Sequence, residues 1–288
     1  MFTFGTDPEF FLKQNDKYVS AIGKINGTKE VPDILQNGAG LQYDNVALEF
    51  ASPICIDITG VVNSLRETFN LIKNKIPGIT MDCTPSAFFP PEELTNEKAQ
   101  EFGCSPDYNV WERKVNEPPT PLDPTFRSCG GHVHLGATED SPYNFLLNLE
   151  GKENTIKAMD ITLGLTSVVL DSSEEAIKRK SLYGKAGCFR PKEYGVEYRT
   201  LSNFWLKSPK LVELIYSLSK DALDLVRGGK ITKAINNLGK DFIITSINIG
   251  PKEGVNYIQT IAPYISEQSR VLLLEIVNKE FSFESEWI

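Results

Sequence analysis

The sequence contains few of the residues that bind soft metals or cross-link a chain. Its 288 residues include two histidines and five cysteines. The cysteines are far apart and odd in number, and none has the Cys-x-x-Cys spacing of a structural zinc site. A disulfide framework is disfavoured for the same reasons. We therefore interpret the cysteines as scattered buried thiols in a reducing compartment.

Long hydrophobic runs and an excess of positive charge are absent as well. The N-terminus has neither the basic segment nor the apolar stretch of a secretory signal, and the most apolar stretch, residues 163–170, is too short to cross a bilayer. We expect a cytoplasmic protein with no membrane partner. Thirty Lys and Arg against 38 Asp and Glu give a net charge of -8. That balance disfavours non-specific nucleic-acid binding but leaves room for a local basic pocket.

Strand patterns dominate the first two thirds of the chain and helical patterns the last third. Since strands and helices rarely alternate and no linker interrupts residues 1–288, we predict one α+β domain with a largely antiparallel sheet. A turn at Thr6-Asp7-Pro8 is expected to break the first strand. Strands are predicted over residues 2–4, 10–12, 43–50, 132–135 and 196–201. Helices are predicted over residues 56–76, 90–102, 153–170, 174–180, 209–226, 231–238 and 267–279, and residues 118–124 form a proline-rich loop.

Ionisable side chains recur two residues apart in segments with strand character. Residues i and i+2 of a strand project from the same face, so each pair is presented together. On a half-buried face such groups are costly unless they are paired or bind a cation. The pairs are Asp7 with Glu9, His132 with His134, and Glu197 with Arg199, and Glu49 ends a fourth segment of this kind.

The two histidines are the most informative of these residues, because both stand in residues 130–136 (GGHVHLG). Flanking glycines let a backbone or ligand approach closely, and the spacing suits metal ligands on one face. The alternative is an exposed strand with two solvated imidazoles. By themselves, Asp7 and Glu9 are equally compatible with a solvated turn, and Glu197 and Arg199 with a cross-strand ion pair.

Carboxylates predominate in this set, with at most two nitrogen ligands and no thiolate, which suits Mg²⁺ or Mn²⁺ better than a structural Zn²⁺. Metal-bound carboxylates beside Lys and Arg are what phosphoryl transfer requires. Most of residues 178–180 (KRK) is interpreted as the solvated end of a helix. A P-loop is absent, and residues 38–40 (GAG) precede a strand rather than a helix, unlike a Rossmann fingerprint. The cations between the predicted strands are Arg127, Lys178, Arg179, Lys180, Lys185, Arg190 and Arg199.

In order along the chain, these motifs resemble the carboxylate–amine ligases with a glutamine synthetase-like fold. Residues 5–11 (GTDPEFF) are similar to the opening strand of glutamine synthetase, although Asp7 stands where Glu is usual. Residues 130–134 (GGHVH) are similar to the H-x-H segment of glutamate–cysteine ligases. Glu49 fits the second acidic strand, and residues 197–199 (EYR) resemble the strand that closes the site.

The resemblance is greatest to the phage and bacterial COOH–NH2 ligase type 2 amidoligases. Residues 102–107 (FGCSPD), 183–187 (YGKAG) and 194–200 (YGVEYRT) carry it. It extends from residue 1 to about residue 206, whereas residues 207–288 add only helices. If a phage encodes the chain, the compartment would be the host cytoplasm.

The resemblance implies an ATP-dependent reaction in two steps. ATP phosphorylates a substrate carboxylate to an acyl phosphate, and an amine then displaces phosphate to form an amide or peptide bond. The substrates would be amino acids, a peptide or a protein end. Two or three Mg²⁺ or Mn²⁺ ions would be held by Asp7, Glu9, Glu49, His132 and Glu197. His134 would contact the nucleotide, and we expect Lys185 and Arg127 to join it. Arg190 and Arg199 would stabilise the transferred phosphoryl group.

Three other functions compete with this one. A kinase of the same superfamily would stop after phosphoryl transfer. A metallohydrolase that uses H-x-H would require further histidine ligands, which the chain lacks. A non-catalytic interaction module with a ligase fold is the third, although every acid, histidine and arginine that the resemblance requires is present.

Overall fold

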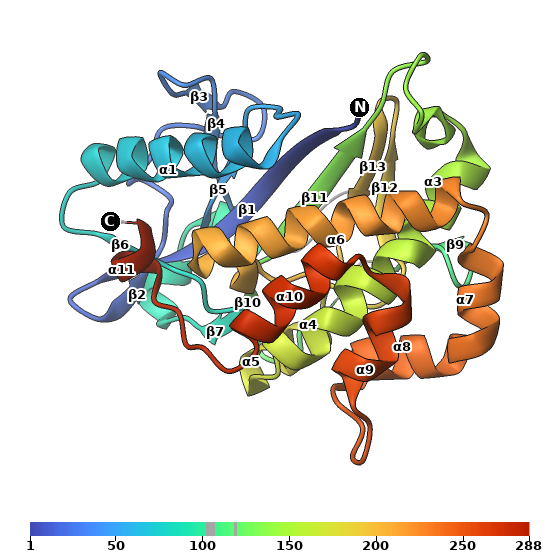
Figure 1. Ribbon diagram of the computed structural model, residues 1–288. Helices are drawn as coiled ribbons and strands as arrows, with labels where there is room; N and C mark the ends of the chain where they lie inside the picture. Colours follow the sequence, from blue (N-terminus) through green and yellow to red (C-terminus); the bar gives the residue numbers. More distant parts are fainter. Residues whose placement is uncertain (102–106, 118–119, 288) are drawn as a thin grey trace.

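The computed structural model describes residues 1–101, 107–117 and 120–287. Most of the 102–107 motif, with Cys104, and the first prolines of the 118–124 loop therefore lie outside the described residues. The fold is α+β, as predicted: one large antiparallel sheet is covered on one face by helices (Figure 1). None of the helices in the described ranges is both long and apolar enough to cross a membrane.

Within the described residues the main sheet has eleven strands. Nine follow the order β3-β4-β5-β1-β11-β13-β12-β8-β9, and β2 and β6 also pair with β1. A separate two-stranded sheet joins β7 and β10. The strands are β1 (Thr3–Gln14), β2 (Lys17–Val19), β3 (Asp33–Ile34), β4 (Gly40–Asp44), β5 (Ala47–Ala51), β6 (Thr80–Asp82), β7 (Ser86–Phe88), β8 (Tyr108–Asn109), β9 (Lys114–Val115), β10 (Phe126–Ser128), β11 (Gly131–Gly136), β12 (Cys188–Lys192) and β13 (Gly195–Tyr198).

The helices follow the predicted order, with changes at several boundaries. The long predicted helices at residues 56–76 and 209–226 are confirmed as α1 and α6. The larger helices are α1 (Ile58–Lys75), α3 (Leu149–Met159), α4 (Leu165–Leu170), α5 (Glu174–Arg179), α6 (Pro209–Arg227), α7 (Ile231–Leu238), α8 (Lys240–Ile249), α9 (Tyr257–Ile261), α10 (Glu267–Ile276) and α11 (Phe283–Trp287). Short helical turns are η1 (Pro91–Leu94), α2 (Glu97–Gln100), η2 (Asn144–Leu147), η3 (Asp160–Gly164), η4 (Asn203–Lys207) and η5 (Ala262–Tyr264).

Two strand predictions were wrong because short-range signals competed with pairing. The expected turn at Thr6-Asp7-Pro8 is absent, and β1 continues through it. Proline is tolerated at residue 8 because β1 changes its pairing partner there. Strand β11 pairs with β1 from Thr3 to Pro8, whereas β5 pairs with Glu9 and Phe10. The expected strand over residues 43–50 is instead the β4–β5 hairpin. Its turn contains Asn45, whose positive φ of 54° suits an asparagine.

One helix prediction was wrong: the helix expected over residues 90–102 is reduced to η1 and α2. The helix expected over residues 153–170 is confirmed, and it contains one π-helical turn, η3, between α3 and α4. Strand β12 was not predicted; it includes Pro191, which pairs with Val196 of β13.

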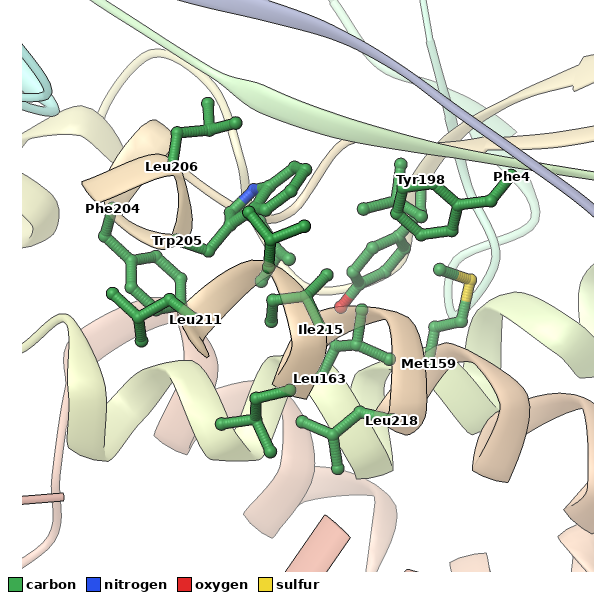
Figure 2. Packing of buried hydrophobic residues seen from close by; sticks show 14 of the residues in the cluster. Phe4, Met159, Leu163, Tyr198, Phe204, Trp205, Leu206, Leu211, Ile215 and Leu218 are labelled. Atoms are coloured by element: carbon green, nitrogen blue, oxygen red, sulfur yellow. The ribbon is translucent and has the colours of Figure 1, made fainter. Parts of the chain in front are cut away.

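The core lies between the sheet and the helices. Figure 2 shows Phe4 of β1 and Tyr198 of β13 pointing from the sheet toward Met159 and Leu163 of the helical layer, beside Trp205. At the other end of β1, Phe69 of α1 contacts Phe10 (ring centroids 5.7 Å apart) and, on the C-terminal helix, Phe283 (4.8 Å). Phe69 is 0% exposed. Its side chain therefore packs between the sheet and the C-terminal helix and contacts both.

Phe69→Ala should therefore lower the free energy of unfolding by about 3–5 kcal/mol, because it leaves a cavity among aromatic rings that cannot collapse fully. Chemical denaturation would measure the loss. Glu67→Ala, on the exposed face of the same helix, is the control and should change stability by no more than about 0.5 kcal/mol. An equal effect of both substitutions would contradict the proposed docking of the C-terminus on Phe69.

Candidate active site on the polar face of the sheet

Strand register places the predicted site residues in one band, on the sheet face opposite the layer of long helices. Residues directly opposite each other in paired strands project from the same face. Tyr198, between two of these residues, points to the helical layer instead (Figure 2). The opposed pairs are Glu9 with Glu49, Asp7 with His132, His134 with Glu197, and Glu197 with Arg190.

Asp7 lies between the two imidazoles. Its Oδ1 is 3.1 Å from His132 Nδ1 and 3.0 Å from His134 Nε2. Burial alone would raise the pKa of Asp7, but the charges and hydrogen bonds of His132 and His134 lower the pKa well below its ordinary value. His134 is held from its other side, because its Nδ1 lies 2.6 Å from the Tyr194 hydroxyl. The Asp7 carboxylate is therefore a fixed negative charge at the centre of the band.

Glu49 and Glu9 add negative charge beside Asp7. Glu49 is 7% exposed and accepts a hydrogen bond of 2.8 Å from Gln42 Nε2. Glu9 Oε2 accepts one of 2.6 Å from the Gly130 amide. Burial, followed by the charges of Asp7 and Glu9, raises the pKa of Glu49 well above its ordinary value. A site in which carboxylates oppose one another's ionisation is suited to a divalent cation, which would relieve the repulsion.

Glu197 is surrounded by cations. Its carboxylate forms an ion pair with Arg199, lies 3.3 Å from Arg190 Nη1, and lies 2.7 Å from Lys192 Nζ. Burial and Asp7 would raise the pKa of Glu197, but Arg199 and the two histidines outweigh them and lower the pKa to about 2. Lys192 was not predicted, although it follows Arg190 by two residues on β12 and so faces the same side.

Arg199 connects the band to its surroundings and is only 4% exposed. Its Nη1 lies 3.4 Å from His132 Nδ1, and its Nε lies 3.4 Å from Asp107 Oδ2. The prediction that Arg199 and Glu197 share a face is confirmed by their ion pair, and Tyr198 between them points into the helical layer. The planar guanidinium thus reaches a carboxylate on each side and an imidazole.

The residues brought together include a candidate metal set. Ligand atoms of Asp7, His134 and Glu197 all lie within 4.8 Å of one another. Oxygen ligands with one imidazole suit Mn²⁺ or Mg²⁺, so the donor set fits the expected metals. His134, expected at the nucleotide, therefore lies with the candidate ligands. The expected ligands Glu9, Glu49 and His132 occupy the adjoining part of the band.

Two cavities meet at this band, and the remaining predicted residues line them. The first is lined by Glu9, Arg127, Gly130, His132, Arg179 and Arg199, and the second by Asp107, Trp111, Asn116 and Lys185. Leu182, Tyr183 and Arg199 line both. Arg127 is buried, and its guanidinium donates to Asn45 Oδ1 and to the carbonyls of Pro124, Phe126 and Ala99 at 2.7–2.8 Å. It therefore supports the cavity wall in this conformation.

Arg179 was missed. We interpreted it as part of a solvated helix end, and the structure contradicts this: the side chain is 1% exposed and lines the first cavity. Its Nη1 donates to the Thr200 carbonyl at 3.1 Å, whereas its Nε has no partner in the described chain. A Cβ at residue 130 would lie 2.4 Å from His132 Nε2 and 3.1 Å from Arg179 Nη2, so Gly130 lets both groups approach. Its burial depends on contacts with Gly130 and Thr200, which the local helical pattern does not reveal.

The family model described as Phage phiEco32-like COOH.NH2 ligase-type 2 matches residues 123–227. The matched segment extends from β10 to the end of α6 and contains both histidines, Arg190, Glu197 and Arg199. The match confirms the resemblance to this amidoligase family, whereas Asp7, Glu9 and Glu49 lie outside the matched residues. No curated protein matches the chain.

Glu49→Gln should raise the melting temperature of the metal-free protein, and the gain should grow as pH rises. A carboxyl whose folded pKa is raised lowers stability as pH increases from its ordinary pKa through the raised one, and Gln removes that penalty while keeping the acceptor for Gln42. Melting curves from about pH 5 to about pH 8 test this. Added Mg²⁺ should then stabilise the wild type more than the variant. Glu253→Gln, on an exposed loop, is the control. If Glu49→Gln were less stable than the wild type at every pH, the Glu49 carboxylate would not be destabilised by its neighbours.

Proposed function

We propose that the protein is an ATP-dependent carboxylate–amine ligase that works through an acyl-phosphate intermediate. The family match supports a ligase that joins a carboxylate to an amine. ATP dependence and the intermediate are supported by one observation: carboxylates, two imidazoles and two arginines occupy a continuous band on one sheet face. That combination is suited to phosphoryl transfer, because a metal neutralises phosphate oxygens while guanidinium groups contact the developing charge.

Asp7, His134 and Glu197 would hold a first Mg²⁺ or Mn²⁺ ion, and Glu9, Glu49 and His132 would take part in holding a second. When bound, the metals would supply positive charge to the phosphate oxygens of ATP. The excess of carboxylates around Glu49 supports this assignment, because burial and the charges of Asp7 and Glu9 disfavour ionisation of Glu49 in the absence of a cation.

The arginines would bind the anionic groups. In the first step a substrate carboxylate oxygen attacks the terminal phosphorus of ATP and ADP leaves. In the second, the amine nitrogen attacks the acyl carbon, loses a proton, and phosphate leaves with the former carboxylate oxygen. Arg190 and Arg199 would contact the transferred phosphoryl group. Arg179, buried beside Glu9 and His132, is a further donor for an oxyanion in the first cavity.

ADP release in the presence of Mg²⁺ should require both an acid and an amine, and mass spectrometry should detect the amide. A screen of amino acids and cell metabolites supplies the substrates. Glu9→Gln and His132→Ala should abolish turnover, because each removes a group that the metals and phosphates require. Glu9→Gln should leave the melting temperature unchanged or higher, because it removes one negative charge from a site rich in carboxylates. ADP release with the acid alone and a stable phosphorylated product would indicate a kinase instead.

Arg199→Lys should lower kcat by about 10²–10³-fold, because an ammonium group cannot reproduce the planar donors of a guanidinium at a preorganised contact. KM for ATP should change much less. Steady-state kinetics at saturating Mg²⁺ measure both constants. If Arg199 served only as an ion-pair partner of Glu197, Lys would retain charge and most of the activity, so a variant close to wild type would contradict its phosphoryl contact.

A further inference from the structure

Asp160 is a buried carboxylate on the opposite side of the sheet from the band. It stands in η3, the π-helical turn between α3 and α4, and is 0% exposed. Its Oδ1 accepts a hydrogen bond of 2.7 Å from the Tyr198 hydroxyl, and its Oδ2 accepts one of 2.6 Å from Trp111 Nε1. Burial raises the pKa of Asp160 to about 6, even though both hydrogen bonds lower it. A carboxylate at this depth is costly, so both of its oxygens are engaged.

The first partner, Tyr198, stands between Glu197 and Arg199. Side chains alternate along a strand, so the Tyr198 ring enters the helical layer while its two neighbours face the band. Strand β13 ends at Tyr198. Beyond it, the Arg199 amide donates to the Cys188 carbonyl at 3.0 Å. The hydrogen bond from Tyr198 to Asp160 therefore fixes the end of β13, one residue before Arg199.

The second partner, Trp111, lies in the turn between β8 and β9. This hairpin borders Asp107, which lies 3.4 Å from Arg199 Nε and accepts a hydrogen bond of 2.8 Å from Asn116 Nδ2. Trp111, Asp107 and Asn116 all line the second cavity. Asp160 thus holds, through separate oxygens, the strand that presents Arg199 and the hairpin that supplies its acidic partner.

The π-helical turn brings Asp160 and the tyrosine together. A Cβ at Gly164, in the same turn, would lie 2.9 Å from the Tyr198 hydroxyl and 2.6 Å from Ile247 Cδ1. Only a glycine leaves room for the hydroxyl at this position. Single π-helical turns inside α-helices are frequent at functional sites, which agrees with a role beyond packing.

We propose that Asp160 is a positioning residue that fixes Arg199 and the Asp107 hairpin relative to each other from behind the sheet. It touches no substrate. The consequence for turnover rests on the proposed ligase function, whereas the effect on the position of Arg199 does not. The two are therefore tested by separate measurements.

The first measurement is the ¹⁵N–¹H resonance of the Trp111 indole and of the Arg199 Nε–H group, identified with Trp111→Phe and Arg199→Lys. Asp160→Ala and Tyr198→Phe should each shift both resonances. Trp287, whose indole donates to the Leu206 carbonyl in another part of the core, is the internal control that should not move. An unmoved Arg199 resonance in Tyr198→Phe, which deletes a single oxygen and should fold, would overturn the proposal whether or not turnover is found.

The second measurement is the division of effects between kcat and KM. Asp160→Ala should lower kcat by about 10- to 100-fold with little change in KM for ATP, because a small displacement of a catalytic group slows the chemical step. Asp160→Asn should restore most of kcat, since its amide oxygen accepts from Trp111 and its amide nitrogen donates to Tyr198. The double variant Asp160→Ala/Tyr198→Phe should have the same kcat as Asp160→Ala alone. Each single substitution already removes the hydrogen bond between Tyr198 and Asp160.

Asp221→Ala is the matched control. Asp221 is a second buried carboxylate of the helical layer, and it accepts hydrogen bonds from Ser266 far from the band. This variant should lose stability and keep kcat. If Asp160→Ala behaves in the same way, with a lower melting temperature and unchanged kcat, Asp160 is only structural. If the wild type shows no turnover with any substrate, the ligase function fails, and the two resonances still decide whether Asp160 positions Arg199.

Discussion

The antiparallel pairing of β1 with β11 is the interaction on which the rest of the site depends. It sets Asp7 opposite His132 and, through the alternation of side chains, keeps Phe4 and Phe10 on the helical side. A shift of one residue would bury Asp7 in the aromatic core and expose the phenylalanines, which is energetically prohibitive. Hydrophobic burial on one face therefore determines the positions of the charged groups on the other.

The charges are balanced unevenly along the band. At one end, Glu197 is neutralised by Arg199, Arg190 and Lys192, and its pKa is lowered. At the other end, burial and the charges of Asp7 and Glu9 raise the pKa of Glu49. Under the proposed function, such a gradient would favour a cation at one end of the band and an anionic group at the other.

The helical layer contributes more than stability. Tyr198 and Asp160 link it to the strand that carries Glu197 and Arg199, and Arg179 enters the first cavity from the end of α5. The family match covers these helices together with β11, β12 and β13. The part of the band from His132 to Arg199 and the helices that pack behind it thus form one continuous segment, whereas Asp7, Glu9 and Glu49 come from strands outside it.

The sequence alone determined the α+β class, the long helices and the residues of the band, because each depends on local patterns: helical spacing in residues 56–76, and i, i+2 pairs around His132 and Glu197. The tertiary structure determined which segments, far apart in the sequence, are in contact. Pro8 could remain within a strand because β1 changes partner there. Arg179 became buried because Gly130, Gly184 and the Thr200 carbonyl pack against its guanidinium. Neither outcome is encoded in neighbouring residues, since both depend on contacts between segments far apart in the chain.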